Sequence, residues 1–209
     1  HEWDLSEQVG IHYGMRLPFY SSAGKKYTAI EPRITIRINL DETTSWKSSY
    51  TQMNQFLHAI PYSSASLPTD IWIASGPLVR PQNSAQYATG IFKNLKDDLY
   101  EISLELYHKE MKHQALFRQG TQLNLTSDIE RALTFGHGTS YGAELFVRKN
   151  TGLFTGWLSY TWSKTTQVFR ELNFGKPFPF TYDRRHNVAL VGTYELSERW
   201  SCAADFVFR

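Results

Sequence analysis

Apolar and polar residues alternate along most of this chain. The clearest run extends from Ile30 to Leu40, where isoleucine or leucine occupies nearly every second position and residues such as Arg33 and Arg37 lie between them. Successive side chains of a β-strand point to opposite faces. The run therefore predicts a strand with one apolar and one polar face. Pro32 lies near its start, where a missing backbone donor matters least.

The same period of two recurs along the chain, whereas a helical period is weak. It is clear in the segments that begin at Val9, Tyr100, Tyr141 and Trp200, and less cleanly separated in four others. The sequence thus predicts an all-β, antiparallel fold with about nine strands. The expected strands are residues 9–17, 30–40, 46–56, 85–94, 100–106, 141–148, 154–163, 185–195 and 200–209.

The connections between these strands are of two kinds, short polar turns and long segments, which alternate along the chain. Transmembrane barrels of the bacterial outer membrane show this asymmetry, with short periplasmic turns and long extracellular loops. The long segments are rich in aromatic residues and proline, which argues against disorder and predicts loops that pack on each other or on a ligand. The expected turns are residues 41–45, 95–98, 149–152 and 196–199, and the expected loops are 20–28, 57–84, 109–139 and 164–184.

Aromatic residues make up 15% of the 209 residues and recur near the ends of the expected strands. Alternation alone fits a soluble sandwich as well as a membrane barrel, but aromatic girdles at the two membrane interfaces favour the barrel. No stretch reaches the roughly 20 apolar residues of a membrane-spanning helix, although transmembrane strands alternate and average out polar. The aromatic residues concerned are Trp3, Trp46, Tyr100, Tyr107, Trp157, Tyr160, Trp162, Tyr194 and Trp200.

Charge and cysteine content further limit the classes of protein to which the chain can belong. The net charge of +2, from 22 basic and 20 acidic residues, gives no electrostatic argument for nucleic acid as a partner. The single cysteine, Cys202, excludes an intrachain disulfide framework, and its alternating surroundings predict a buried or lipid-facing side chain. The first residues, His1 to Asp4, lack the charged start and apolar run of a signal peptide. We expect either a removed leader or, preferably, an internal fragment of a longer protein.

Several short segments match a known family in its own order. They are residues 47–72, Pro81-Gln82, residues 86–90, Tyr141 to Glu144, residues 156–163 and Tyr182 to His186, and Glu31-Pro32-Arg33 fits the same pattern. Together they resemble the barrel of TonB-dependent outer-membrane receptors, particularly those of Bacteroidetes. The resemblance covers essentially the whole chain. Each motif is weak alone, whereas the ordered set is specific.

The resemblance implies an antiparallel transmembrane β-barrel of about 22 strands, plugged by an N-terminal domain. It implies energised uptake of a scarce nutrient (a siderophore, cobalamin, glycan or peptide) by an outer-membrane protein of a Gram-negative bacterium. The implied partners are outer-membrane lipid, TonB through the plug region, the nutrient ligand and a surface lipoprotein. No cofactor and no enzymatic activity are expected. Residues 1–209 would form part of a single barrel domain, without the plug and the remaining strands.

Two groups of residues invite a chemical interpretation. Asp183 and His186 suggest an acid–base pair, but no serine nucleophile elbow accompanies them, and a charged strand start at the loop–lumen boundary is favoured. The histidines at 108, 113 and 137 suggest a metal site, but their spacing matches neither a strand face nor a zinc-binding helix. We therefore expect exposed loop histidines and no metal site.

Two sets of residues are expected to serve transport. Charged residues on the polar faces of the strands should line the lumen and contact the plug, or form a polar path for a solute. Aromatic and polar residues of the long loops suit sugars, flat chelates and anionic groups. The lumen set is Arg16, Arg33, Arg37, Glu101, Glu105, Glu144 and Arg148, and the ligand-binding set is Trp72, Arg80, Phe135, His137, Phe178 and Tyr182.

Three other functions remain open on the sequence alone. A passive porin-like barrel gains some support from Phe206 and Phe208, since an aromatic-ended last strand suits a complete barrel. A soluble all-β module that binds carbohydrate would use the apolar faces as a core. An outer-membrane hydrolase would need a nucleophile and a base that meet at the barrel rim.

Overall fold

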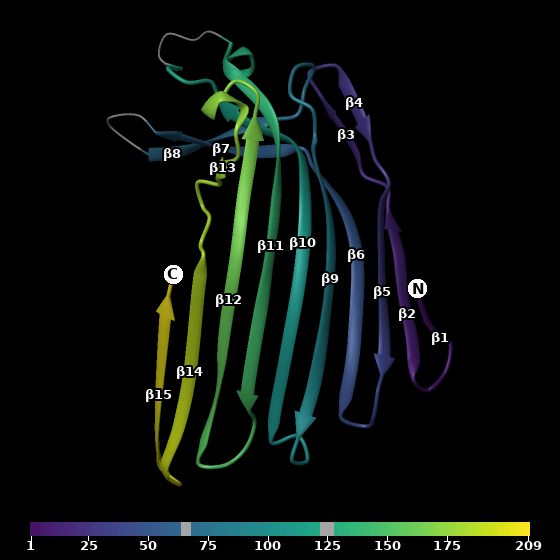
Figure 1. The fold of residues 1–209 in the computed structure, drawn as a ribbon, viewed down its shortest axis with the longest axis vertical. Helices are drawn as coiled ribbons and strands as arrows, with labels where there is room; N and C mark the ends of the chain where they lie inside the picture. The colour runs from purple at the N-terminus through teal and green to yellow at the C-terminus, as the bar shows by residue number, and fades with distance from the viewer. Residues whose placement is uncertain (64–67, 122–127) are drawn as a thin grey trace.

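One long, curved antiparallel sheet dominates the structure (Figure 1). The computed structural model describes residues 1–63, 68–121 and 128–209. All nine expected strands are present, so the all-β prediction is confirmed. Along the sheet the strands are β1 (Glu2–Asp4), β2 (Val9–Arg16), β5 (Glu31–Asn39), β6 (Thr44–Gln55), β9 (Gln82–Leu95), β10 (Tyr100–Phe117), β11 (Leu133–Lys149), β12 (Phe154–Phe169), β14 (His186–Ser197) and β15 (Trp200–Phe208). In the described residues, β1 and β15 form the two open edges of this sheet.

The segments expected to be long loops contain more structure than predicted. Two hairpins, β3 (Phe19–Ser22) with β4 (Lys25–Thr28) and β7 (Leu57–Ser63) with β8 (Pro68–Ala74), lie at the upper end in Figure 1. A short strand, β13 (Phe178–Pro179), pairs with β12. The 3-10 helices are η2 (Ile129–Ala132) and η3 (Asn173–Gly175), and no helix of the described residues is long and apolar enough to cross a membrane.

The expected loop over residues 109–139 was also too long. β10 continues to Phe117 and β11 starts at Leu133, so much of this segment is strand. In this upper part the apolar–polar alternation fades, although the backbone pairing continues. A β-bulge between Lys112 and Gln114, with His113 at a φ of 56°, marks this transition in β10.

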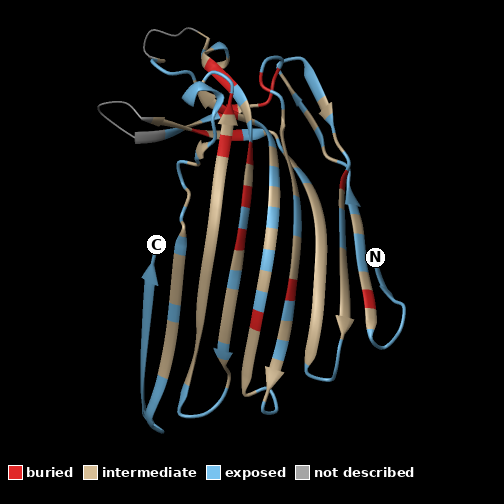
Figure 2. Ribbon diagram, in the orientation of Figure 1, coloured by how far each residue is buried: buried red, intermediate tan, exposed pale blue. Residues whose placement is uncertain are grey.

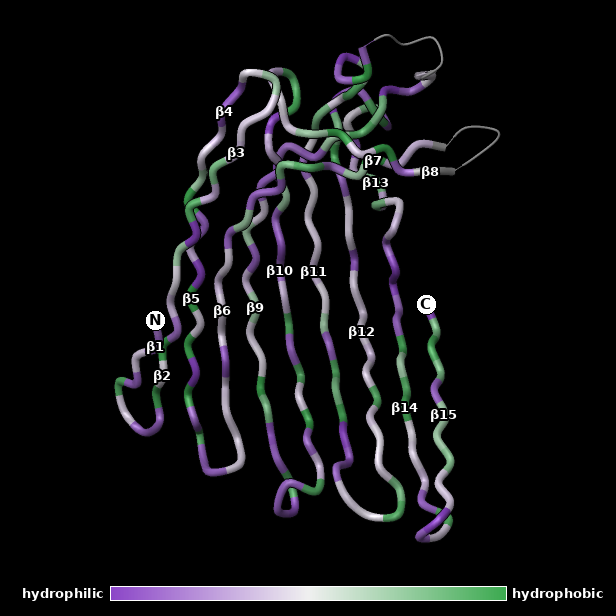
Figure 3. Tube along the Cα trace, turned by 180° about the vertical axis from the view of Figure 1, so that it is seen from behind, coloured by the Kyte–Doolittle hydropathy of each residue, from purple (hydrophilic) through white to green (hydrophobic). Residues whose placement is uncertain are grey.

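The cross-strand register places the apolar residues on one side of the sheet. Leu104 lies opposite Ile91 on β9 and Leu145 on β11, and Leu145 lies opposite Tyr160 on β12. Leu104 is 51% exposed although it lies within the strand. An exposed apolar surface that extends over many strands is what lipid contact requires. Figure 3 shows the same alternation of hydrophobic and hydrophilic residues along the strands.

Aromatic residues border this apolar side. The register aligns Tyr13, Tyr50, Tyr87 and Tyr141 in one row towards the hairpin end, and the Tyr50 and Tyr87 rings lie 4.8 Å apart. We call this row the upper girdle. Tyr100, Phe154, Tyr194 and Trp200 lie near the opposite strand ends. Among the aromatics expected at the interfaces, Trp46 lies near the start of β6, Tyr107 and Trp157 instead face the polar side, and Tyr160 lies in mid-strand.

The short turns form the lower end in Figure 1. In the turn between β5 and β6, the Asp41 carboxylate accepts hydrogen bonds from both the backbone N–H and the hydroxyl of Thr43, each at 2.8 Å. These bonds lower the pKa of Asp41 to about 2. In the next turn Lys96, Asp97 and Asp98 all have positive φ values. Because outer-membrane barrels keep their short turns in the periplasm, the hairpin end is the extracellular end.

A small core lies at the extracellular end. Ile60 and Ile73 of the β7–β8 hairpin pack with Val79, Ala115 and Leu133, all of them buried. Burial is otherwise sparse along the sheet (Figure 2), as expected where one side meets lipid. The hairpin is therefore anchored across β10 and β11, which are far from it in sequence.

Candidate functional site

The polar side of the sheet carries all seven residues of the expected lumen set. Their cross-strand partners are also glycine, serine, threonine or charged residues over much of this side, as in the row that links Gly90, Glu105, Glu144 and Thr161. In a closed barrel this side faces the lumen. A cavity of about 1010 Å³ lies against it near the periplasmic end and is lined by Lys47, Glu101, Glu105 and Glu144, among others.

Ion pairs hold part of this polar side in place. Arg16 Nε lies 2.8 Å from Glu31, whose carboxylate is buried and also accepts the backbone N–H of Asn54 at 2.7 Å. Arg148 lies 3.7 Å from Glu101 across β11 and β10. These pairs join neighbouring strands of the wall, so their first effect is structural.

Other groups on the polar side are incompletely satisfied, and Arg37, for example, pairs with Asp4 at 3.7 Å through Nη2. Glu105 and Glu144 are direct cross-strand neighbours, an arrangement of like charges that destabilises a sheet on its own. In the described residues Arg37 Nε, Gln167 Oε1 and Asn187 Oδ1 are buried without a hydrogen-bond partner. Buried polar atoms are nearly always paired. The polar side is therefore suited to contact a further polar component in the lumen.

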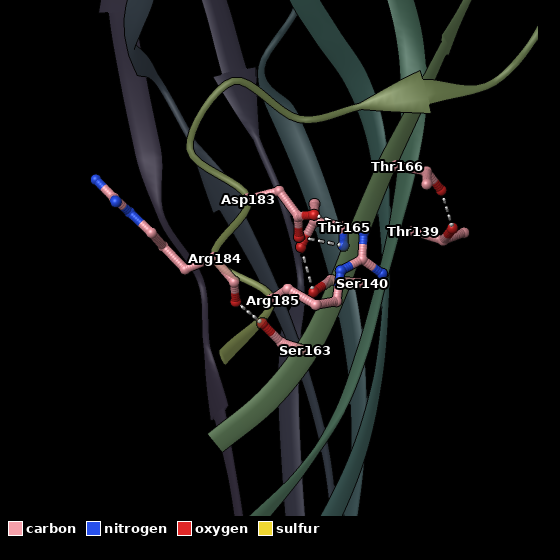
Figure 4. A network of polar contacts seen from close by, with 8 residues as sticks. All are labelled: Thr139, Ser140, Ser163, Thr165, Thr166, Asp183, Arg184 and Arg185. Atoms are coloured by element: carbon pink, nitrogen blue, oxygen red, sulfur yellow. Dashed lines mark hydrogen bonds and ion pairs between the residues drawn. The ribbon is translucent and has the colours of Figure 1, made fainter. Parts of the chain in front are cut away.

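The segment before β14 is held by a polar network that Figure 4 shows. Asp183 accepts the backbone N–H of Thr165 at 2.8 Å and forms an ion pair with Arg185 at 2.9 Å. The hydroxyl of Ser163 donates to the Arg184 carbonyl at 2.8 Å. His186 is not part of it, since its Nδ1 lies 2.8 Å from the Tyr160 hydroxyl. The acid–base pair of Asp183 and His186 is thus not formed, and the cluster attaches the loop to β12.

The three histidines considered for a metal site each have a different neighbour. His108 lies 3.8 Å from Glu110, and His113 Nδ1 lies 3.1 Å from the Pro81 carbonyl oxygen. His137 is the cross-strand partner of Lys112. Over residues 1–63, 68–121 and 128–209, no group of three or more His, Cys, Asp or Glu residues could hold a metal ion.

The six expected ligand-binding residues lie in three different places. Trp72, Phe178 and Tyr182 belong to the β7–β8 hairpin and to the segment between β12 and β14. Phe135 and His137 alternate with the polar-side residues of β11 and therefore lie on the outward side, above Tyr141. The remaining residue, Arg80, lines a separate pocket described below. The structure thus does not bring all six together.

A smaller aromatic cluster does form at the extracellular end. The Tyr182 hydroxyl donates a 2.5 Å hydrogen bond to Asp70, and the Tyr182 ring meets Phe180 edge-on at 5.6 Å. Trp72, two residues beyond Asp70 on the same face of β8, is 63% exposed. The sequence analysis missed Asp70, because nothing in the local pattern distinguishes it from a solvated loop carboxylate. We call Asp70, Trp72, Phe180 and Tyr182 the extracellular cluster.

The buried pair of His58 and Ser75 was also missed. Both side chains are 0% exposed, and His58 Nε2 lies 2.8 Å from Ser75 Oγ. Burial lowers the pKa of His58, so the imidazole is kept neutral. His58 Nδ1 has no partner among the described residues. The pair closes the base of the β7–β8 hairpin.

An antiparallel sheet with one aromatic-bordered apolar side and one charged side is the wall of an outer-membrane β-barrel. The family described as "TonB dependent receptor-like, beta-barrel" matches residues 1–208. The chain belongs to this family of TonB-dependent receptor barrels, and it is accordingly part of a Gram-negative outer-membrane protein. No curated protein matches the sequence.

Solved structures of receptors share the fold. The ferripyoverdine receptor of Pseudomonas aeruginosa, bound to ferripyoverdine, has a TM-score of 0.68 at 14% identity over 98% of this chain and 26% of that one. The alcaligin outer-membrane receptor FauA of Bordetella pertussis has a TM-score of 0.65 at 17% identity over 100% and 36%. The FrpB iron transporter of Neisseria meningitidis has a TM-score of 0.62 at 11% identity over 95% and 30%. This chain therefore spans about a quarter to a third of these solved chains.

Proposed function

We propose that the chain forms part of the barrel wall of a receptor that takes up a scarce nutrient with energy delivered through TonB. Residues 1–209 would belong to a single barrel domain, and a plug would fill the lumen. The observation that carries this proposal is the polar side, where Glu105 and Glu144 lie side by side and Arg37 Nε is buried without a partner. A plug that brings donors to the two carboxylates and an acceptor to the Arg37 Nε–H would satisfy these groups.

The nutrient would first meet the extracellular cluster. Trp72 and Phe180 offer ring faces, and Asp70 and Tyr182 offer a fixed acceptor and a hydroxyl oxygen. Such groups suit sugars and flat chelates. The structural relatives include proteins described as receptors for ferripyoverdine and alcaligin, so a siderophore is one candidate beside cobalamin, a glycan or a peptide. A surface lipoprotein is a further proposed partner, and the 98% exposed ring of Phe174 near this end is one surface for it.

Uptake by cells that express the full-length receptor tests the proposal. Cells with and without functional TonB would be grown on a panel of ferric siderophores, cobalamin, glycans and peptides as limiting nutrients. We expect growth on one class, dependent on TonB, and reduced by Trp72→Ala. Trp200→Ala is the matched control, because Trp200 is equally aromatic and exposed but lies at the periplasmic end. Growth on no member of the panel, or growth independent of TonB, contradicts the proposal.

A passive porin is the main alternative, and conductance in a planar lipid bilayer distinguishes it. A plugged receptor conducts little until the plug is removed, whereas a porin conducts as an open channel. We expect the full-length protein to be closed and a plug-deleted form to be open. A large steady conductance of the full-length protein would favour the porin.

A further inference from the structure

A second pocket lies on the outward side of the sheet, away from the lumen. It has a volume of about 340 Å³ and is bounded by the β3–β4 hairpin and the upper ends of β6, β9 and β10. Its lining includes Gln52, Asn54, Arg80, Lys112 and His113. We call it the basic pocket, after the last three residues. None of these residues belongs to the extracellular cluster.

The register fixes the side on which the basic pocket lies. Gln52 and Asn54 follow Tyr50 at every second position of β6, and Lys112 follows His108 in the same way on β10. Tyr50 belongs to the upper girdle, and His108 lies in the same row opposite Tyr87 and Tyr141. The pocket therefore continues the lipid-facing side. Four residues along a strand span about 13 Å, which a tilt of roughly 40° reduces to about 10 Å of height.

That height places the basic pocket at the level of lipid headgroups. Girdle aromatics lie at the membrane–water interface, with the headgroups just above the hydrocarbon core. Below the pocket on this side, the ring of Tyr87 lies in the row of His108, and Leu106 lies two residues further down β10. A lipid whose acyl chains cover this apolar surface would present its headgroup to the pocket.

The charges of the basic pocket suit an anion. Its lining contains Arg80, Lys112 and His113 and no carboxylate, and neither Arg80 nor Lys112 has an ion-pair partner in the described part of the chain. The nearest acid on this side of β10, Glu110, is directed to His108. On β11, His137 lies beside Lys112. Arginine and lysine together are a common combination for phosphate.

Neutral hydrogen-bond donors complete the pocket. The Gln52 side-chain carbonyl accepts from the Tyr50 hydroxyl at 3.1 Å, which orients the Gln52 amide and leaves its N–H groups to the pocket. Asn54 is held by Glu31 at 3.2 Å, and Tyr27 donates to the Gly76 carbonyl at 2.9 Å. The walls are thus fixed by bonds to the rest of the protein, as a preformed site requires.

We propose that the basic pocket binds a phosphate group of an outer-leaflet lipid. The position above the girdle selects a lipid over free phosphate, since only a lipid also covers the apolar surface below. The outward side selects it over the nutrient, which must reach the lumen. The bound lipid would fasten the β3–β4 hairpin and the upper ends of β6, β9 and β10 to the membrane surface.

Lipid binding by the full-length receptor in detergent tests the inference. The probes are lipid A, a diphosphorylated glycolipid, its enzymatically dephosphorylated form, and inorganic phosphate alone. We expect lipid A to bind and the dephosphorylated form to bind at least about ten-fold more weakly, a difference of about 1.4 kcal/mol, because it lacks the anionic groups that Arg80 and Lys112 would pair with. The double variant Arg80→Gln and Lys112→Gln should lose affinity for lipid A by a similar factor.

Two controls make the result specific. Lys93→Gln removes a lysine on the same side but near the periplasmic end, where Lys93 bonds Thr44 at 3.1 Å, and it should bind lipid A as the wild type does. Lys112→Arg keeps the charge and should retain binding, which separates loss of charge from loss of fold. Equal binding of the two lipid forms, or unchanged binding by the double variant, overturns the inference. Inorganic phosphate that binds as tightly as lipid A also overturns it, as does a double variant impaired only in nutrient uptake.

Discussion

The Tyr182 hydroxyl donates a 2.5 Å hydrogen bond to the Asp70 carboxylate, joining two segments that are 112 residues apart in the chain. This bond raises the pKa of Tyr182, because it holds the phenolic proton and because the nearby negative charge opposes ionisation. It directly joins the β7–β8 hairpin to the segment that leads into β14. The position of the hairpin over the extracellular end thus depends on a contact that no local pattern specifies.

Alkaline titration should release this contact. The folded-state pKa of Tyr182 lies above its ordinary value of 10.0, so the stabilisation is present below that value and is lost as the pH rises through the folded pKa. The difference in tyrosinate absorbance between wild type and Tyr182→Phe isolates this residue. We expect its midpoint above 10.0 in the wild type and a lower midpoint in Asp70→Asn. Identical midpoints with and without the Asp70 carboxylate would contradict the assignment.

Adjacent residues on β10 should respond in opposite ways to the same substitution. Leu104 faces lipid in mid-strand, so Leu104→Arg should destabilise the barrel by about 2–4 kcal/mol. Glu105 faces the polar side opposite Glu144, so Glu105→Arg replaces a like-charge pair with an ion pair and should be tolerated. Urea unfolding of the full-length receptor in lipid vesicles measures both. A larger loss for Glu105→Arg would reverse the assignment of the two sides.

Gly142 should tolerate no side chain. A Cβ at this position would lie 2.5 Å from the Trp162 carbonyl oxygen and 2.8 Å from the Tyr107 ring, which covers the glycine on the polar side. Gly142→Val should therefore cost about 1–3 kcal/mol through overpacking. Ala143→Val, one residue along on the lipid side, is the matched control and should be nearly neutral. Equal unfolding free energies for the two variants would show that Tyr107 moves aside without cost.

The predictable part of the fold is the part that crosses the membrane. Lipid on one side and a polar lumen on the other impose the alternation that Ile34, Ile36 and Ile38 display, so strands and sides follow from the pattern. Above the girdle that constraint ends. The upper part of β10, from Lys109 to Phe117, was accordingly mistaken for a loop.

The candidate site residues show the same difference: those on strands could be placed from the sequence, and those in loops could not. The seven lumen-set residues share one side because period-two alternation is reliable within a strand. The ligand-binding set was chosen by residue type in loops, which carries no information about distance. The structure consequently places Trp72 on the same strand face as Asp70, which binds Tyr182, but Phe135 on the outward side of β11. The basic pocket was missed for the same reason, since Arg80 and Lys112 meet only through the β9–β10 register and the bulge at His113.

Acidification should loosen the β7–β8 hairpin through His58. Burial keeps its folded-state pKa below the ordinary value of 6.5, so the opened hairpin binds a proton more readily than the closed one. The closed form therefore loses stability as the pH falls below 6.5, and above that value the imidazole is neutral in both forms. Ser75, bonded to His58 at 2.8 Å, would lose its acceptor or be displaced when the charged ring leaves.

Hydrogen–deuterium exchange of the β7 amides in the full-length receptor measures this loosening. After correction for intrinsic exchange rates, protection in the wild type should be flat above the ordinary histidine pKa of 6.5 and should fall as the pH is lowered from 6.5 to about 5. His58→Gln keeps a hydrogen-bonding group near Ser75 but cannot take up a proton, so its protection should be independent of pH over this range. The β11 amides provide an internal reference, because they pair within the sheet away from His58. If β7 protection in the wild type is as flat as in His58→Gln, the buried imidazole does not control the hairpin.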